Sequence, residues 1–375
     1  MIVYLIMLLL SIVFIFIAQK SKNKVLKVIL YICSILPLFL VSALRYDLGT
    51  DYTKTYVSIF RKLSVNKVTK DLEISFELLV RACLLISNNP NILFVVTAFI
   101  TLVLIMITIL TKSQNKILSV IIFVLGGFYF ETLNLVRQYI AIAIIFLSSQ
   151  LLLKKRWKYD ILFLLIVIFS VTIHFSSIVA LVIVLLNKRT FVDYKWLIPI
   201  SVGIIMFKSD IVSLLERVIE MTKYKKYLDI SGEISYLNII KNIFLFIVMQ
   251  YVYNQAKKQN KLENADRFYL NIQGLTLLVV CLGACNFQFS RIAIYFYIFQ
   301  IMSIPHFITK LSMEPFENLI KKIFKKENLK IKLKPFVYIG VVLLFGVNIF
   351  YTNVLNNDNE VIPYKTIINK DITIY

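Results

Sequence analysis

Apolar runs of membrane-spanning length follow one another along the whole 375-residue chain. A transmembrane helix needs about 20 mostly apolar residues to cross a hydrocarbon core about 30 Å thick. The runs at 160–173 and 175–186 are the weakest, and they form one broken helix or a short hairpin if they are not two spans. The pattern predicts about twelve spans, at residues 2–18, 26–44, 91–111, 117–130, 138–153, 160–173, 175–186, 196–207, 242–256, 268–285, 292–309 and 335–352.

The composition agrees with this pattern. Apolar and aromatic residues make up 59% of the chain and charged residues 17%, with a mean hydropathy of +0.79. Soluble domains are usually about 45–50% apolar and about 25% charged, so a water-soluble globule is excluded. The run at 2–18 has no basic segment before it and no small-residue cleavage site after it, which predicts a retained helix. We therefore predict an all-α polytopic membrane protein with one transmembrane domain over residues 1–375.

Loop charge predicts the topology. The net charge of +21 alone would suggest a nucleic-acid partner, but its position is more informative. With twelve spans, one set of loops holds 25 Lys and Arg in 66 residues, and the opposite set holds 17 in 116. The positive-inside rule places the first set in the cytoplasm and both termini outside. Merging 160–186 into one span would put basic segments 154–158 and 188–195 on opposite faces, which favours two spans.

Three extramembrane segments are notable. Residues 316–334 alternate lysines with apolar residues at helical spacing, which predicts a cytoplasmic basic amphipathic helix on the inner leaflet. Residues 45–90 and 208–241 form long outer loops that are rich in polar groups. Long loops in a compact protein are more often functional than idle, so these outer loops are candidates for a site.

Four ionisable residues lie at the predicted outer ends of spans, namely Arg45, Arg137, His174 and Arg291. Each is 14 to 19 residues from the nearest predicted cytoplasmic lysine. At about 1.5 Å per helical residue, all four fall at one level near the outer edge of the hydrocarbon core. An arginine at the end of a span is often only an anchor, and a lone membrane histidine often only packs. Their common level instead favours an outward-facing basic site.

The neighbours of two arginines strengthen this hypothesis. Glu131 and Gln138 lie close to Arg137 between apolar runs, and Tyr295 lies one turn from Arg291. Arginine binds phosphate with two parallel hydrogen bonds and stays charged when partly desolvated. We therefore expect an anionic ligand, with a lipid-linked pyrophosphate as one candidate.

Other chemistries find no support in the sequence. Cys281 and Cys285 are four residues apart, but no histidine or carboxylate pattern accompanies them, so no metal site is predicted. The chain has no Walker loop, dinucleotide fingerprint, HExxH or GxSxG motif. No cofactor is expected.

Several motifs resemble the EpsG family of Wzy-like bacterial polysaccharide polymerases. They occur in order across nearly the whole chain, whereas the residues between them match only in hydropathy. The motifs are RYDLGTDYTKTY (45–56), LVRQYIAIAI (135–144), KKRW…IHFSS (154–177), SRIAIYF (290–296) and VIPYK (361–365).

The resemblance implies a GT-C-like helical fold, no metal, and a role in making capsule, exopolysaccharide or O-antigen. Such an enzyme works at the outer face of the bacterial cytoplasmic membrane. It transfers a growing glycan from undecaprenyl pyrophosphate onto the next lipid-linked repeat unit. Its implied partners are this lipid-linked oligosaccharide, membrane lipid, and the chain-length regulator and flippase of the same pathway. No nucleic acid is expected.

Within this hypothesis the candidate residues take different roles. Arg137 and Arg291, supported by Arg45 and with Gln138 and Tyr295 beside them, would bind the donor pyrophosphate and stabilise the departing charge. A base must accept the proton of the attacking hydroxyl. The candidates for this base are His174, which we rank first, then Asp47, Asp51 and Glu131, although Asp47 and Asp51 are alternatively structural.

Two other functions remain open from the sequence. A flippase for the same lipid-linked units also needs a cationic site, but it should carry polar groups at several depths. Here the charged residues of the spans gather at one level. A related membrane glycosyltransferase or ligase that adds one glycan has the same chemistry, and only the resemblance favours a polymerase.

Overall fold

The computed structural model describes residues 1–67, 72–187, 190–220, 236–314, 316–317 and 333–368. Helices account for all regular elements among these residues, and the one β-bridge within them pairs Arg45 with Thr366. The chain forms two compact units. Unit 1 holds residues 1–148, 168–177 and 312–375, and unit 2 holds 149–167 and 178–311.

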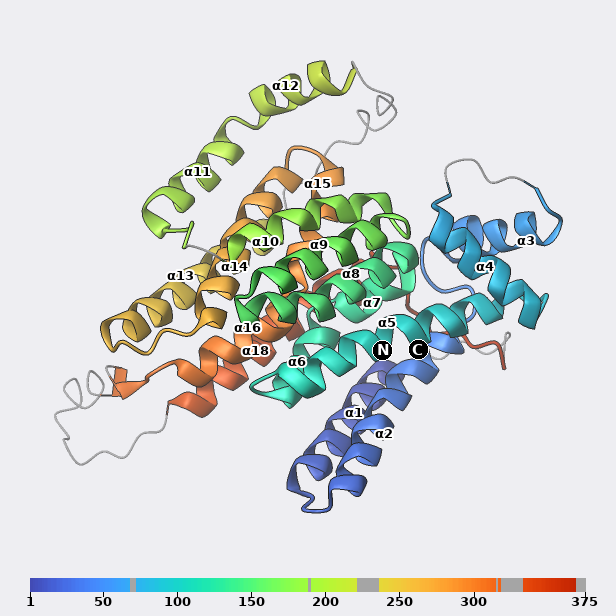
Figure 1. Ribbon diagram of the computed structural model, residues 1–375, viewed down its shortest axis with the longest axis horizontal. Coiled ribbons are helices and arrows are strands. Elements are labelled where there is room, and N and C mark those ends of the chain that lie inside the picture. The colour runs from blue at the N-terminus through green and yellow to red at the C-terminus, as the bar shows by residue number, and fades with distance from the viewer. Residues whose placement is uncertain (68–71, 188–189, 221–235, 315, 318–332, 369–375) are drawn as a thin grey trace. The chain divides into compact units, whose positions relative to one another are not determined.

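Unit 1 is built on long apolar helices. Helices α1 and α2 form an antiparallel hairpin, in which Asn23 caps α2 by accepting hydrogen bonds from the backbone N–H groups of Val25 and Leu26 (Figure 1). Helix α6 packs against α1, and α18 packs against α6. The elements are α1 (Ile2–Lys20), α2 (Lys24–Ala43), the π-helix η1 (Tyr52–Val57), α3 (Ser58–Ser64), α4 (Ile74–Ile86), α5 (Asn91–Lys112), α6 (Lys116–Leu125), α7 (Phe128–Asn134), α8 (Val136–Ser148), α18 (Lys334–Ile349) and the π-helix η5 (Phe350–Leu355).

Unit 2 is built around α14, which contacts α11, α13, α15 and α16. Helices α9 (Trp157–Val171) and the 3₁₀ helix η3 (Phe175–Val182) each cross the boundary between the units. The other elements are the 3₁₀ helix η2 (Ser149–Lys154), α10 (Ile183–Leu186), α11 (Tyr194–Met206), α12 (Lys208–Glu220), α13 (Tyr236–Lys258), α14 (Asn264–Gly283), α15 (Phe287–Tyr297) and α16 (Gln300–Lys310).

The prediction of a polytopic all-helical membrane protein is confirmed. Among the described residues, seven helices are long and apolar enough to cross a membrane, and three bent helix pairs raise the number to ten. The predicted runs 160–173 and 175–186 do not add full spans. Helix α9 has 15 residues, and residues 175–186 begin as a 3₁₀ helix, so both are shorter than a span requires.

The predicted spans at 117–130 and 138–153 imply a loop at 131–137, and the bent helix pair α6–α7 corrects this expectation. The two helices meet at 51° across Gly126 and Gly127, and Gly127 has a left-handed φ of 91°. Because glycine adopts this conformation without strain, the chain bends there and then continues as helix. Glu131 therefore lies in α7, and Leu135 alone separates α7 from α8.

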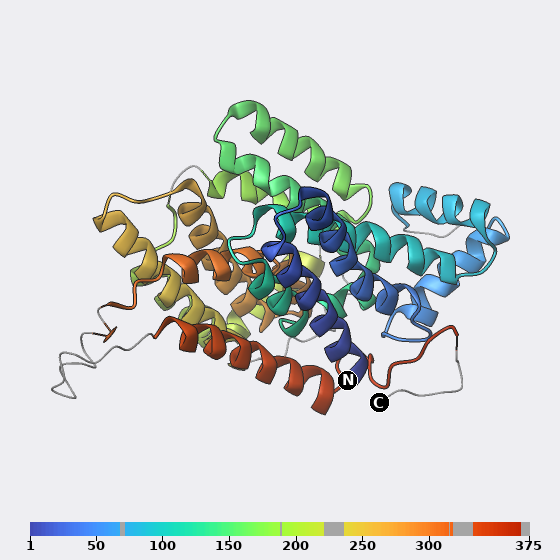
Figure 2. The ribbon, with the colours of Figure 1, turned by 90° about the horizontal axis from the view of Figure 1, so that it is seen from below.

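The predicted extramembrane segments contain helices where they are described. Residues 45–90 hold η1, α3 and α4, and α3 and α4 lie side by side in both views (Figures 1 and 2). Residues 208–241 begin with α12. Most of the predicted amphipathic helix at 316–334 lies outside the described residues.

The C-terminal segment joins two motifs that are far apart in sequence. Tyr46 N–H donates to Lys365 O at 2.9 Å, and Ile367 N–H donates to Leu44 O at 2.9 Å. Asn134 then connects both segments to α7, because its Oδ1 accepts from Thr50 N–H at 2.8 Å and its Nδ2 donates to the Asn359 backbone. The RYDLGTDYTKTY and VIPYK motifs are thus neighbours in unit 1.

Gly49 packs against this junction and gives the first prediction. Its φ is +97°, and a Cβ there would overlap Asn134 Oδ1. We expect Gly49→Ala to destabilise the protein by about 2 kcal/mol, because it adds a steric overlap to a strained backbone. The measurement is the thermal unfolding midpoint of the purified protein in detergent. Gly340→Ala is the control, since a Cβ at this helical position meets nothing within 4 Å. Equal midpoints for the two variants would contradict the prediction.

Candidate functional site

A single carboxylate in unit 1 joins the two strongest candidates from the sequence. Arg137 Nη1 donates to Glu73 Oε2 at 2.6 Å, and His174 Nδ1 lies 3.0 Å from Glu73 Oε1. The backbone N–H of Phe175 donates to the same Oε1 at 3.2 Å. The side chains of the three residues are each about one fifth exposed. Glu73, Arg137 and His174 are called the ionic triad below.

Three separate elements position the triad. Glu73 immediately precedes α4, and its carboxylate makes no hydrogen bond to cap its own helix. Arg137 lies in the first turn of α8, and His174 follows the end of α9. Ser75 at the start of α4 is tied to Thr172 by a backbone hydrogen bond of 2.9 Å and by a hydroxyl contact of 2.6 Å. This pair of contacts holds the beginning of α4 beside the histidine segment.

The triad keeps Glu73 ionised. Burial acts to raise the pKa of Glu73, but the hydrogen bond from His174 and the charge of Arg137 outweigh burial and lower the pKa from 4.5 to about 2. A carboxylate with such a low pKa holds no proton at neutral pH, so Glu73 cannot serve as a general acid there. Its role is to accept hydrogen bonds from the Arg137 and His174 side chains and from the Phe175 backbone.

The other sides of Arg137 and His174 carry unused hydrogen-bonding groups. Arg137 Nε is buried and has no partner among the described residues. Among the described residues, the hydrogen bond of the His174 ring is made by Nδ1, and Nε2 has no partner. When Nδ1 donates its proton to a carboxylate, the neutral imidazole presents a lone pair at Nε2. The arrangement therefore combines a proton acceptor with a guanidinium on one carboxylate.

A cluster of four aromatic rings, Tyr52, Tyr56, Phe76 and Phe94, extends from Arg137. Tyr52 stacks on Phe94 with ring centroids 4.0 Å apart, and Tyr56 contacts both phenylalanines edge to face. Arg137 lies over the Phe76 ring at 5.8 Å. Its backbone N–H also donates to Tyr56 Oη at 3.4 Å. The cluster packs against the first turn of α8 and fixes the position of the Arg137 guanidinium.

Arg45 lies on another ring of the same cluster and is buried, with 1% of its surface exposed. Its guanidinium is 4.8 Å from the Phe94 ring centroid. Nη1 donates to Ser42 O and Ser42 Oγ, and Nη2 donates to Leu133 O at 3.2 Å. The described contacts of the Arg45 guanidinium are therefore with Ser42, Leu133 and the Phe94 ring, and its support of pyrophosphate binding stays a prediction from the sequence.

Two of the carboxylates considered as bases accept hydrogen bonds within their own loop. Asp47 Oδ1 accepts from the Thr53 hydroxyl at 2.6 Å, and Asp51 Oδ1 accepts from the Thr55 hydroxyl at 3.2 Å. Glu131 lies elsewhere, on α7. Its Oε2 accepts a short hydrogen bond of 2.5 Å from the Tyr139 hydroxyl on α8.

The remaining predicted residues are not part of the triad. Gln138 is 3% exposed and follows Arg137 on α8. Arg291 and Tyr295 belong to unit 2, where Arg291 is exposed on α15 and Tyr295 is fully buried. The proposed contribution of Arg291 and Tyr295 to ligand binding stays a prediction from the sequence.

Glu73 is the residue that sequence reasoning missed. It is 64 residues from Arg137 and 101 residues from His174. Within residues 45–90 it is one of several acidic side chains, and no motif sets it apart. Its one signal is its place just before an apolar helical run, a position that usually predicts only a cap.

The fold and this site define a polytopic helical membrane protein with a partly buried ionic triad. Arg137 lies at the start of the candidate span Val136–Lys154, whereas Glu73 and His174 lie outside the candidate spans of the described residues. The EpsG family model matches residues 28–366, so the chain belongs to the EpsG family. This membership confirms the resemblance and associates the protein with membrane-bound polysaccharide synthesis. No curated protein and no solved structure matches the chain.

The low pKa of Glu73 predicts a pH dependence of stability. Since the native pKa is below the ordinary 4.5, the triad stabilises the fold fully above about pH 4.5. This contribution is lost as the pH falls toward 2. Between pH 7 and 3 we expect acidification to cost the wild type about 2 kcal/mol more than Glu73→Gln, which has no such charge to lose.

The measurement is the thermal unfolding midpoint between pH 7 and 3 in detergent. Glu77→Gln is the matched control, because Glu77 also pairs with an arginine, Arg81 at 2.7 Å, on the exposed side of α4. Exposed ion pairs contribute about 1 kcal/mol or less to the free energy of unfolding, so the midpoint of Glu77→Gln should change with pH as that of the wild type does. If Glu73→Gln follows it too, the triad does not stabilise the fold.

Proposed function

We propose that this protein is a bacterial polysaccharide polymerase. It transfers a growing glycan from undecaprenyl pyrophosphate onto a lipid-linked repeat unit, and the product is a capsular polysaccharide, exopolysaccharide or O-antigen. Membership of the EpsG family supports the substrate class. The structural observation that carries the proposal is the Glu73 carboxylate, which holds a guanidinium and an imidazole within 3.0 Å of its two oxygens.

The reaction requires the two groups that the triad presents. The acceptor hydroxyl oxygen bonds to the anomeric carbon of the donor sugar, and the bond from this carbon to the pyrophosphate oxygen breaks. The electron pair leaves with the pyrophosphate, and the hydroxyl proton passes to a base. A cation must stabilise the departing charge, and a base must be poised near neutral pH.

Arg137 is the cation of the triad. Its guanidinium is always charged, and it presents donors in a planar fork that matches a phosphate. One donor, Nη1, is used by Glu73, which fixes the orientation of the fork. Binding of the departing pyrophosphate would use the remaining donors.

His174 is the base of the triad, and Glu73 is its positioning residue. The hydrogen bond at Nδ1 selects the tautomer whose Nε2 accepts a proton, and the carboxylate stabilises the imidazolium that forms. Asp47, Asp51 and Glu131 are less suited, since each already accepts a hydrogen bond from a neighbouring hydroxyl. We assign Arg45 a structural role because its guanidinium is buried and bonded to backbone carbonyl oxygens.

The proposal includes the topology inferred from loop charge. The triad faces the outside of the cytoplasmic membrane, where residues 45–90 and both termini also lie. The GT-C-like arrangement, the single transmembrane domain and the cytoplasmic helix at 316–334 are retained as parts of this proposal, whereas the number of spans is the seven to ten found among the described residues. The chain-length regulator and flippase of the pathway are its expected partners.

The first functional prediction concerns Arg137→Lys, which keeps a positive charge but removes the fork. We expect this variant to lower the amount of long-chain polysaccharide by about tenfold or more, because a point charge cannot replace two parallel hydrogen bonds. The measurement is the length distribution of surface polysaccharide in a strain that lacks the protein and is complemented with each variant. Arg81→Lys is the control, because Arg81 is exposed and pairs only along its own helix.

The same strains separate polymerisation from transport. A polymerase defect leaves single lipid-linked repeat units on the outer face of the membrane. Units trapped on the cytoplasmic face would instead indicate a flippase and overturn the proposed function. Normal chain length in Arg137→Lys would overturn the assignment of a bidentate pyrophosphate ligand.

A second functional prediction tests the base and its positioning residue. The contact of Glu73 with Nδ1 orients the imidazole so that Nε2 can accept the hydroxyl proton. In Glu73→Gln we therefore expect the kcat of polymer synthesis to fall about tenfold or more, and to fall by a larger factor than KM rises. Membranes supplied with lipid-linked repeat units at several concentrations provide both constants. Glu73→Asp should restore part of the wild-type kcat, and Glu77→Gln should leave it unchanged. An unchanged kcat in Glu73→Gln would exclude the proposed role of Glu73.

A further inference from the structure

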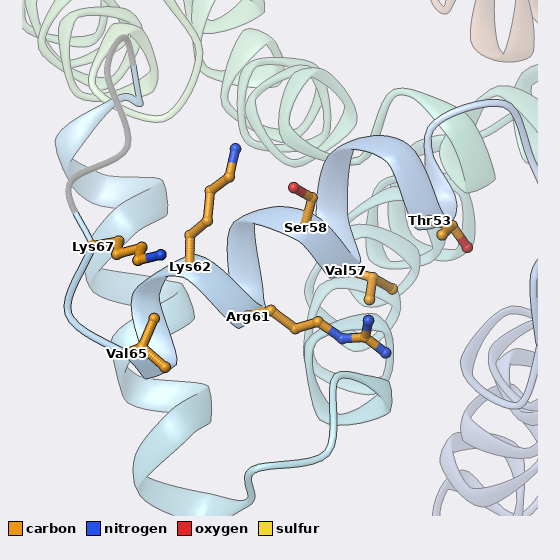
Figure 3. Close-up of a pocket in the computed structure, with 7 residues that line it drawn as sticks. All are labelled: Thr53, Val57, Ser58, Arg61, Lys62, Val65 and Lys67. Carbon is orange, nitrogen blue, oxygen red and sulfur yellow. The ribbon is translucent and has the colours of Figure 1, made fainter.

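Helix α3 borders a pocket that the proposed mechanism does not use. The pocket has a volume of about 300 Å³ and is lined by residues from η1, α3 and the turn after α3 (Figure 3). It is called the α3 pocket below. Its lining residues are Thr53, Val57, Ser58, Arg61, Lys62, Val65 and Lys67.

The charge of the α3 pocket is strongly one-sided. Arg61, Lys62 and Lys67 contribute three positive charges, and none of the described residues that line the pocket is acidic. All three side chains are exposed, and they form no ion pair with any residue that the structure describes. Like charges around one pocket repel one another, and a polyvalent anion would relieve the repulsion.

A helix cap brings two of these charges together. Lys67 N–H donates to Lys62 O at 2.9 Å, and Asn66 N–H donates to Leu63 O at 3.1 Å. Asn66 has a left-handed φ of 52°, which completes a Schellman motif at the end of α3. This motif usually places an apolar pair at the two positions that Lys62 and Lys67 occupy. Two lysines there give up an apolar contact and place their ammonium groups on the same side of the pocket.

Exposed apolar side chains lie near the α3 pocket. Val65 in its wall is 62% exposed. The adjacent helix α4 exposes Ile74, Leu78 and Leu85, which lie on one face at helical spacing and are 61–90% exposed, and the Glu77–Arg81 ion pair lies along the edge of this face. Helix α4 has 13 residues and is too short to span a bilayer. An exposed apolar face on a short helix of a membrane protein is typical of a helix lying at the membrane interface.

We propose that the α3 pocket binds the phosphate group of a membrane lipid. A basic pocket beside an interfacial helix matches a phosphate group at the level of the headgroups, with the lipid tail along Val65 and α4. Lys62 and Lys67 lie at one end of the pocket, and Arg61 points toward Val57 (Figure 3). The phosphate would lie toward Lys62 and Lys67, because Thr53 at the opposite end donates its hydroxyl to the exposed carboxylate of Asp47 (Figure 3). The Ser58 hydroxyl lies in the wall and offers a further donor.

The test is equilibrium binding of the purified full-length protein in a neutral detergent. The three probes are short-chain phosphatidic acid, phosphatidylcholine with the same chains, and inorganic pyrophosphate. We expect phosphatidic acid to bind most tightly, since phosphatidylcholine carries its own neutralising cation and pyrophosphate has no tail. Arg61→Gln/Lys62→Gln/Lys67→Gln should weaken phosphatidic acid binding about tenfold. This assay needs no turnover, so its outcome is independent of the polymerase proposal.

Two further variants make the test specific. Lys20→Gln/Lys22→Gln/Lys24→Gln removes the same charge from exposed positions in the α1–α2 hairpin and should leave binding unchanged. Lys62→Leu/Lys67→Leu restores an apolar pair in the cap, so it should weaken binding without lowering the thermal unfolding midpoint. Equal weakening by the two triple variants would overturn the site. Pyrophosphate binding as tight as that of phosphatidic acid would overturn the lipid as its ligand.

Discussion

The ionic triad depends on one constraint, which is that a partly buried carboxylate must be paired. An unpaired charge at this position would cost several kcal/mol, and Glu73 avoids the cost by accepting hydrogen bonds from Arg137, His174 and the Phe175 backbone. Each of these partners belongs to a different segment from α4. The same contacts that satisfy the carboxylate therefore determine the positions of the first turn of α8 and of the histidine segment. The stability of unit 1 and the proposed reaction therefore both depend on the Glu73 side chain.

Two arginines of unit 1, Arg45 and Arg137, have the same side chain in different surroundings. Arg45 and Arg137 each lie over a phenylalanine ring of the same aromatic cluster. Arg45 is buried, and its donors bond to Ser42 and to the backbone of Leu133, so its charge holds the end of α2 against α7. Arg137 is partly exposed and shares a carboxylate with a histidine. The cluster supports both arginines, but of the two only Arg137 shares a carboxylate with the proposed base, His174.

The π-helix η1 contributes to two features of unit 1. Tyr52 and Tyr56 are buried and join the aromatic cluster beneath Arg137, whereas Thr53 and Val57 line the α3 pocket. π-helical turns are rare and are often found at functional sites, because they change the direction of side chains within a helix. In this protein neighbouring residues of the turn face the aromatic cluster next to the ionic triad and the α3 pocket proposed to bind a lipid phosphate. Binding at the α3 pocket would thus involve the same short element that supports the triad.

The sequence by itself determined the helical membrane class and the EpsG resemblance, and it singled out Arg137 and His174 as candidates. These follow from hydropathy, from local motifs and from the cost of placing charge near a membrane, all of which depend on neighbouring residues along the chain. Only the tertiary structure decided the partner of the two residues, because Glu73 lies 64 and 101 residues away and no local pattern distinguishes it. The burial of Arg45 and the helical continuation through Glu131 were likewise decided by packing. A residue's partners across such separations depend on how helices pack, and hydropathy along the chain does not encode this packing.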